Sequence, residues 1–307
     1  MTLAAMWVEA RDVGNQLLCF ASDSRTKPGP IEGVAKVVLF GRQDIAAVWA
    51  GDYRYAALLV NFLDAFFTAS DAMRRRDVDV AQALRRAAAA AQRHLQRAIA
   101  PDVKRHELNF DAQQPERTTL VVGGYSVIER AHKVLRIDWT PDDGRWRFRV
   151  ASMDTTKVTF IGDHIKSAKQ IARQARVHRE PRGSANWQME PLAAIHCMRE
   201  DKNRGTIGGL IQLAKVYMHG SARAYGIIDD FRSGDITVRG ICVDSRSARE
   251  MDASGLLVDL SHWKLAQGAY AGHRSLKAAE YAAAPPVRSE GEGPCQDHAA
   301  HHRDSVR

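Results

Sequence analysis

Apolar residues in the first fifty positions fall into four short runs, each bounded by turn-forming residues. The segment EARDVG separates the runs at 2–8 and 15–22, and GRQD separates those at 34–40 and 45–51. This pattern predicts two successive β-hairpins. Both faces of the first two runs are apolar, which is typical of strands that are covered on both sides.

The apolar period then changes to that of a helix, first around Leu59–Phe66 and again from Val80 to Leu95, with Pro101 expected to end the second helix. Later segments return to strand-like patterns, with a further helix pair between them. We expect strands at 117–126, 133–139, 145–152, 157–162, 208–218, 222–228 and 235–243, and helices at 163–177 and 191–200.

Blocks of strands that alternate with pairs of helices indicate an α+β fold. We expect two antiparallel sheets that pack on each other with helices outside, a four-layer αββα sandwich. The pattern predicts one domain over residues 1–265. Residues 266–307, which are rich in alanine, proline and charge, are expected to form a disordered tail.

Composition narrows the class of protein. The four cysteines, Cys19, Cys197, Cys242 and Cys295, have no paired spacing and are interpreted as bystanders in a reducing compartment. The first residues lack the basic start of a secretory signal, and Asn61, Asp64 and Asp71 interrupt the most apolar helix. We therefore expect a cytoplasmic protein with no membrane partner, no cofactor and no metal.

The formal net charge of +8 raises the question of a nucleic-acid partner. Much of the excess lies between Arg74 and Arg105, without the aromatic or zinc-finger motifs of common nucleic-acid-binding modules. A solvated basic helix face is the favoured interpretation, so we do not expect nucleic acid as a partner.

Thr2 is the first candidate for chemistry. In a symmetric first hairpin, residues whose numbers add up to about 25 face each other, which places Asp23 opposite Thr2. Removal of Met1 is usual before a small residue and would leave a free α-amine beside the threonine hydroxyl. An α-amine with a pKa of about 7.7 to 8.0 can act as the general base for that hydroxyl.

Such a site needs a cation near the amine and a carboxylate that holds the cation. Lys36 lies in the otherwise apolar segment VAKVVLF, where an unpaired ammonium would be costly, so we expect Asp23 to be its partner. Gly51 ends a strand directly before a helix, where its backbone N–H can stabilise an oxyanion.

These residues resemble the proteasome β-subunit type of N-terminal nucleophile (Ntn) hydrolase, a family that includes HslV and the bacterial Anbu group. The similarity rests on Thr2, on FASDSRTKPG with Asp23, on AKVV with Lys36 and on AVWAGDYRYAALL with Gly51. It extends more faintly through VTFIGDHIKSAKQIA and REDKNRGTIGGLIQLAKV, and thus covers residues 2–230.

The resemblance implies that Thr2 is the nucleophile and base, Asp23 and Lys36 the supporting pair, and Gly51 the oxyanion donor. Asp163, Asp201 and Thr206 are implied as weaker supporting residues. The chain departs from the family in two places. The turn that often holds serine in the family reads Gly162, Asp163 and His164 here, and the spacing from Asp201 to Thr206 is longer than the Asp-x-x-Ser spacing of the family.

The implied activity is hydrolysis of peptide bonds by a threonine protease, through an acyl-enzyme on Thr2. The resemblance also implies a homo-oligomeric ring, an unfolded polypeptide or peptide as substrate, and an ATPase as possible partner. Two alternatives remain open: an Ntn amidohydrolase that acts on a small amide, and a noncatalytic ring or scaffold subunit of the same fold.

Overall fold

The structure is a computed structural model of the chain, and it describes eleven segments. They are residues 2–12, 15–25, 33–98, 117–141, 145–177, 187–201, 206–228, 236–239, 241–254, 256–260 and 264–265. The expected tail at 266–307 and the expected helix end at Pro101 lie outside the described residues.

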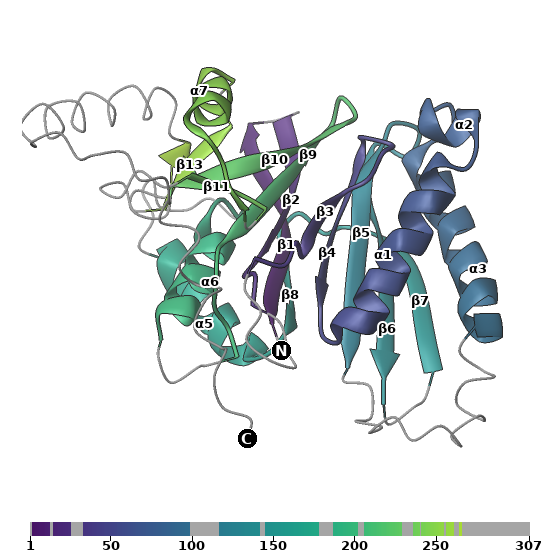
Figure 1. The fold of residues 1–307 in the computed structure, drawn as a ribbon, viewed down its shortest axis with the longest axis horizontal. Helices are drawn as coiled ribbons and strands as arrows, with labels where there is room; N and C mark the ends of the chain where they lie inside the picture. The colour runs from purple at the N-terminus through teal and green to yellow at the C-terminus, as the bar shows by residue number, and fades with distance from the viewer. Residues whose placement is uncertain are drawn as a thin grey trace, which may run out of the picture.

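Two sheets form the centre of an α+β sandwich (Figure 1). The nine-stranded sheet has the path β12-β11-β10-β9-β2-β1-β8, and off this path β13 pairs with β10 and β14 pairs with β13. The five-stranded sheet has the order β3-β4-β5-β6-β7. All neighbouring strands are antiparallel except β10 and β13. The strands are β1 (Leu3–Asp12), β2 (Asn15–Ser22), β3 (Val37–Leu39), β4 (Ile45–Ala50), β5 (Thr118–Ser126), β6 (Ala131–Thr140), β7 (Arg145–Ser152), β8 (Val158–Gly162), β9 (Gln212–Tyr217), β10 (Ser221–Ile228), β11 (Ile236–Val238), β12 (Ile241–Cys242), β13 (Leu257–Asp259) and β14 (Lys264–Leu265).

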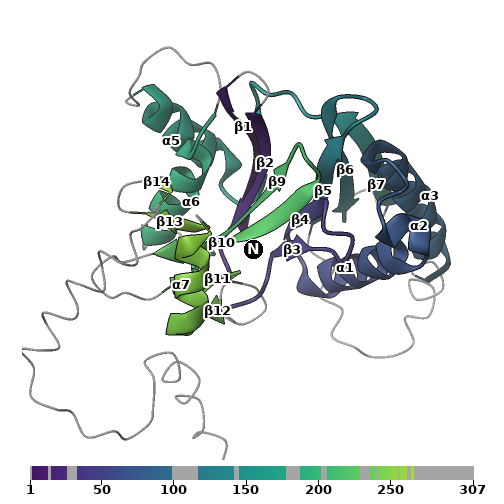
Figure 2. The ribbon, with the colours of Figure 1, turned by 90° about the horizontal axis from the view of Figure 1, so that it is seen from above.

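Helices pack on the sheet faces that point away from the other sheet (Figures 1 and 2). Helices α1 and α3 contact the five-stranded sheet, whereas α5 and α6 contact the nine-stranded one. The helices are α1 (Tyr53–Thr68), α2 (Asp71–Arg74), α3 (Val80–Ala98), α5 (Ile165–Val177), α6 (Glu190–Glu200) and α7 (Ser245–Ala253). None of the helices in the described residues is long and apolar enough to cross a membrane.

Strand β1 illustrates why the N-terminal sequence is apolar at consecutive positions. Leu3, Ala5 and Trp7 pack into the core shared with α5 and α6. The intervening residues, including Ala4 and Met6, pack between the two sheets. The prediction that this strand is covered on both faces is thus confirmed, and it follows from its place inside the sandwich.

The register of the first hairpin differs from the symmetric prediction by one residue. Ala4 pairs with Ser22 and Val8 with Leu18, and the register shifts between Ala10 and Asp12. This irregularity adds a residue to one strand, so Asp23 lies beside Leu3 and its N–H donates to the Leu3 carbonyl oxygen (3.4 Å). The observed pairing lies within one position of the predicted one, and it places Asp23 opposite Leu3, next to Thr2.

The structure adds elements that the apolar pattern did not predict, namely α2, α7, β13 and β14. It also corrects the interpretation of the cysteines, because Cys242 is disulfide-bonded, while Cys19 and Cys197 are free thiols. Cysteine usage therefore gives no support to a reducing compartment.

Candidate functional site

Thr2 lies directly before β1 and is 1% exposed. Its hydroxyl Oγ1 donates to the carbonyl oxygen of Arg25 (3.0 Å) and accepts from the ammonium Nζ of Lys36. The Thr2 carbonyl oxygen accepts from the backbone N–H of Asp163 (2.8 Å). The threonine is thus held at both its side chain and its main chain.

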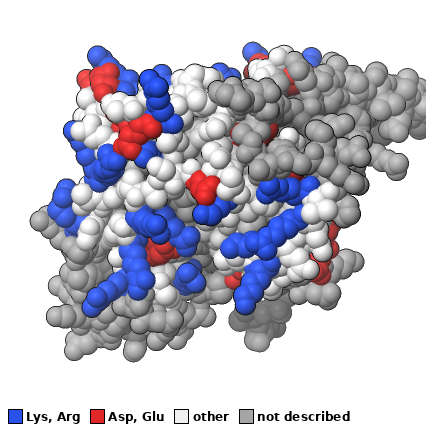
Figure 3. Space-filling view, turned by 180° about the vertical axis from the view of Figure 1, so that it is seen from behind, with Lys and Arg blue, Asp and Glu red and all other residues white. Residues whose placement is uncertain are grey.

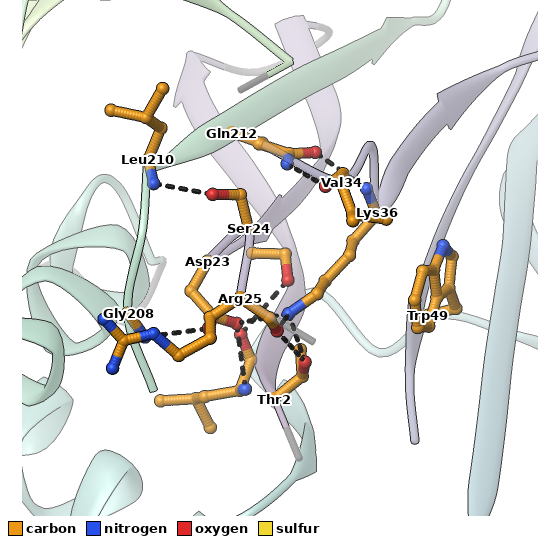
Figure 4. A network of polar contacts seen from close by, with 12 residues as sticks. Thr2, Asp23, Ser24, Arg25, Val34, Lys36, Trp49, Gly208, Leu210 and Gln212 are labelled. Atoms are coloured by element: carbon orange, nitrogen blue, oxygen red, sulfur yellow. Dashed lines mark hydrogen bonds and ion pairs between the residues drawn. The ribbon is translucent and has the colours of Figure 1, made fainter. Parts of the chain in front are cut away.

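Lys36 and Asp23 form a buried ion pair, with 3.2 Å between Nζ and Oδ1 and with both side chains 0% exposed (Figure 4). The Asp23 carboxylate also accepts from the backbone N–H groups of Leu3 (3.2 Å) and Gly208 (3.0 Å). Figure 4 shows the Lys36 side chain extended toward Thr2 and Asp23. The structure therefore brings together the three side chains that the sequence predicts for the site.

Burial dominates the electrostatics of this pair. It lowers the pKa of Lys36 from an ordinary 10.5 to about 8, although Asp23 opposes the change. Burial also raises the pKa of the Asp23 carboxyl, while Lys36 and the N–H groups of Gly208 and Leu3 oppose that rise. Keeping both groups charged in a buried place costs free energy. Ionisable pairs with such perturbed pKa values are typical of functional sites.

Gln212, at the start of β9, fixes the backbone around Lys36 and was not predicted from the sequence. Its side-chain Oε1 accepts from the N–H groups of Lys36 (2.9 Å) and Val37 (3.0 Å), and its Nε2 donates to the Val34 carbonyl oxygen (2.6 Å). Gln212 is fully buried. A lone glutamine within the apolar run LIQLAKV was the available sequence signal.

The segment after β2 is held by the loop before β9. The N–H groups of Ser24 and Arg25 donate to the Gly208 carbonyl oxygen (3.2 and 3.0 Å), and Ser24 Oγ accepts from the N–H of Leu210 (2.7 Å). A Cβ on Gly208 would lie 2.4 Å from the Arg25 guanidinium carbon, so the Arg25 side chain packs directly on this glycine. These contacts place the Arg25 carbonyl oxygen where it accepts from both Thr2 and Lys36.

Two glycines with positive φ line a small cavity next to the site. Gly162 has φ +99°, and a Cβ there would lie 1.7 Å from the Thr2 carbonyl oxygen. Gly51 has φ +117°, and its Cβ would lie 2.1 Å from the Arg117 carbonyl oxygen. Both glycines line one small cavity of about 40 Å³, together with Arg136 and other residues. Close backbone approach thus explains why both positions are glycine.

The three weaker supporting candidates, Asp163, Asp201 and Thr206, do not support Thr2 through their side chains in the contacts described below. Asp163 contacts Thr2 through its backbone N–H, as given above. Asp201 is the C-cap residue of α6. The Thr206 hydroxyl is buried without a hydrogen-bond partner in the described part of the chain, so it does not support Thr2 by that route. The loop acts on the site through Gly208 instead.

No family model matches the sequence, and no curated protein matches it. Among solved structures, the chain is similar to "Anbu (ancestral beta-subunit) from Yersinia bercovieri", with 14% sequence identity and a TM-score of 0.47. The match covers 94% of this chain and 99% of that one. At this sequence identity and TM-score the likeness says nothing about the activity of the chain.

Proposed function

We propose that the chain is an Ntn hydrolase with the four-layer αββα arrangement, in which Thr2 cleaves peptide bonds after Met1 is removed. The observation that carries this proposal is the buried chain of contacts from the Thr2 hydroxyl through Lys36 to Asp23. A hydroxyl that accepts from a buried ammonium has a stabilised negative charge as it loses its proton. Thr2 is therefore the best placed nucleophile of the site.

Removal of Met1 would supply the general base. The free α-amine of Thr2 would take the hydroxyl proton, directly or through a water molecule, as Oγ1 attacks the substrate carbonyl carbon. Lys36 would remain a positively charged donor to Oγ1, held by Asp23. Its ammonium would also disfavour protonation of the nearby amine and so keep that amine available as a base.

The later steps use the same groups. The N–H of Gly51 would donate to the oxyanion, since Gly51 lines the cavity beside Gly162, which touches Thr2. The protonated amine would then give its proton to the leaving nitrogen, so the peptide bond breaks and an ester on Thr2 remains. Water, deprotonated by the same amine, would hydrolyse that ester and restore the hydroxyl.

The site is buried: Thr2 is 1% exposed, and the adjoining cavity measures about 40 Å³. A nucleophile in such a place is reached by a flexible chain more readily than by a folded surface, so we propose an unfolded polypeptide or peptide as substrate. A homo-oligomeric ring in the cytoplasm, with an ATP-driven partner that unfolds substrates, would fit this restriction and remains part of the proposal.

Hydrolysis of fluorogenic peptides by a matched pair of Thr2 variants tests the function. Thr2→Ala removes the nucleophile and should abolish turnover, whereas Thr2→Ser keeps a hydroxyl and an amine and should retain measurable turnover. Circular dichroism and assembly mass would establish that both variants fold. Turnover by Thr2→Ala at the parent rate would place the nucleophile elsewhere and refute the proposal.

A further inference from the structure

The basic stretch between Arg74 and Arg105 includes helix α3, which the proposed hydrolysis does not use. This helix lies beside α1 on the face of the five-stranded sheet that points away from the other sheet (Figures 1 and 2). A hollow of about 510 Å³ lies between them, lined by residues of α1, α2 and α3 and of the link between α1 and α2. These residues are distinct from those around Thr2.

The α1 side of the hollow is apolar. Leu58, Phe62 and Phe66 are spaced four residues apart, so they form one stripe along the helix. Leu58 is 38% exposed, and both phenylalanines are half-buried. Met73 of α2 and Ala89 of α3 add further apolar surface to the hollow. An apolar stripe that stays partly exposed on a helix indicates a surface that a second apolar surface can cover.

The α3 side of the hollow is basic. Arg86 and Arg93 are both exposed and both line the hollow, with Ala89 between them. They are seven residues apart, which places them about 10.5 Å apart along the same side of the helix. The described residues that line the hollow include no acid. The hollow thus combines an apolar wall with two regularly spaced positive charges.

The acidic side chains of this region are occupied elsewhere or lie at a distance. They are Asp64, Asp71, Asp77, Asp79 and Glu129. Asp71 pairs with Arg74 (2.6 Å), and Glu129 pairs with Arg85 (2.6 Å). Asp64 and Asp79 accept from backbone N–H groups, and Asp77 precedes α3. Within the described part of the chain, the two arginines of the hollow therefore form no ion pair.

Charge alone does not single out this hollow. Figure 3 shows the molecule from behind, and Lys and Arg clearly outnumber Asp and Glu among the described residues seen there. Such a surface attracts acidic partners without selecting among them. The combination of an apolar stripe with arginines at helical spacing is what favours a partner of defined geometry.

We propose that the hollow binds a helix of a partner protein, apolar on one face and acidic beside it. The apolar face of that helix would pack on the stripe of α1, in the helix-in-groove mode of recognition. Two carboxylates seven residues apart would pair with Arg86 and Arg93, because both spacings equal two helical turns. Binding here goes beyond the proposed hydrolysis and does not depend on it.

A second copy of this chain does not offer the complementary helix. None of the helices in the described residues carries two acidic residues seven positions apart. Helix α6, for example, has its two acids at Glu190 and Glu200, ten positions apart. The charge of the hollow therefore favours a different protein as the partner.

A helix also fits this surface better than a nucleic acid does. Single-stranded nucleic acids bind where aromatic rings are available for base stacking. The Phe62 ring stacks on His94 (4.6 Å between centroids) and on Phe66 (6.3 Å), and Phe66 also meets Phe67 edge to face. These rings pack on their neighbours and present an apolar wall.

Fluorescence anisotropy of a labelled amphipathic peptide of about 18 residues tests the proposal. Its leucines form one helical stripe, and glutamates seven residues apart flank that stripe. The chain would carry Thr2→Ala, so that hydrolysis cannot remove the probe. We expect Arg86→Gln/Arg93→Gln to weaken binding about tenfold or more, and added salt to weaken it in the parent.

Two further variants separate charge from shape. Ala89→Gln keeps both arginines but places a longer polar side chain in the hollow, so it should also weaken binding. The control Arg145→Gln/Arg149→Gln removes the same charge from exposed positions of β7 and should bind normally. These two arginines alternate with Trp146 and Phe148, which pack toward the helices, so they lie on the other face of the sheet.

Four results would overturn the inference. The first is equal binding by the α3 double variant and the β7 control. The second is equal binding of a peptide of the same composition whose leucines and glutamates are scrambled over all faces. The third is displacement of the probe by a single-stranded oligonucleotide at lower concentration than by unlabelled peptide, which would identify a nucleic-acid surface. The fourth is loss of self-association by Arg86→Gln/Arg93→Gln in sedimentation velocity without peptide, which would identify a second copy as the occupant.

Discussion

The buried Asp23–Lys36 pair leads to a prediction about stability that is opposite to the usual expectation for an ion pair. Burial lowers the pKa of Lys36 from 10.5 to about 8, which corresponds to about 3 kcal/mol against its charged form at neutral pH. Replacing both residues, in Asp23→Asn/Lys36→Met, removes that penalty. We therefore expect the double variant to be as stable as the parent at pH 7, or more stable by up to about 3 kcal/mol.

The single variants should behave in the opposite way. Asp23→Asn leaves Lys36 buried without its carboxylate, and Lys36→Met leaves Asp23 without its cation. Each should lower the free energy of unfolding by about 3 kcal/mol or more, because a buried charge then lacks its partner. The double-mutant cycle would thus show strong coupling between the two positions.

The pH dependence of the same cycle has a defined sign. Between about pH 8 and pH 10.5 the unfolded chain holds the Lys36 proton and the folded chain has released it. The free energy of unfolding of the parent should therefore rise with pH over this interval, relative to the double variant, which lacks both groups. The stability gap between them should narrow as pH rises from 7 to 10.

Urea unfolding followed by far-UV circular dichroism measures all four proteins, since the linear extrapolation gives each free energy. The reasoning would be refuted by a double variant less stable than the parent by more than about 1 kcal/mol. It would equally be refuted by an Asp23→Asn variant as stable as the parent, or by a stability gap that widens with pH.

Two further predictions concern the groups that position the site. Gly162→Ala would force its Cβ against the Thr2 carbonyl oxygen and should lower kcat/KM for peptide hydrolysis about hundredfold. The control Gly220→Ala is also at positive φ, but its Cβ would have no contact under 3.9 Å, so kcat/KM should stay unchanged. Equal losses in the two variants would contradict this prediction. Gln212→Leu leaves two buried backbone N–H groups without their acceptor. It should lower the free energy of unfolding, measured in urea, by about 2 kcal/mol or more. A change below about 0.5 kcal/mol would count against the positioning role of Gln212.

Much of the fold could be predicted from apolar periodicity, because the central strands are buried on both faces and the helices on one. The hairpin of β1 and β2 and the later helix pair α5 and α6 follow this pattern closely. The exact register could not be predicted, since the shift between Ala10 and Asp12 depends on local backbone conformation and not on hydrophobicity. Helix α7 is short and highly polar, so its few apolar residues are too sparse to predict a helix.

The side chains of the candidate site were easier to predict than the groups that hold them. Lys36 is a charge within an apolar segment, and the cost of burying it alone required an acidic partner, which is Asp23. Arg25 and Gly208 act through backbone atoms, whose placement depends on two loops that meet only in the folded chain. Residue identity says little about such contacts.

The central claim is that the mature chain begins at Thr2 and that this residue is the nucleophile. Tandem mass spectrometry of the N-terminal peptide, after incubation with a peptide epoxyketone that needs both a hydroxyl and an α-amine on one residue, tests it most directly. The account predicts a chain that has lost Met1 and carries one adduct on Thr2. Retention of Met1 in the assembled protein, or an adduct on another residue, would contradict it.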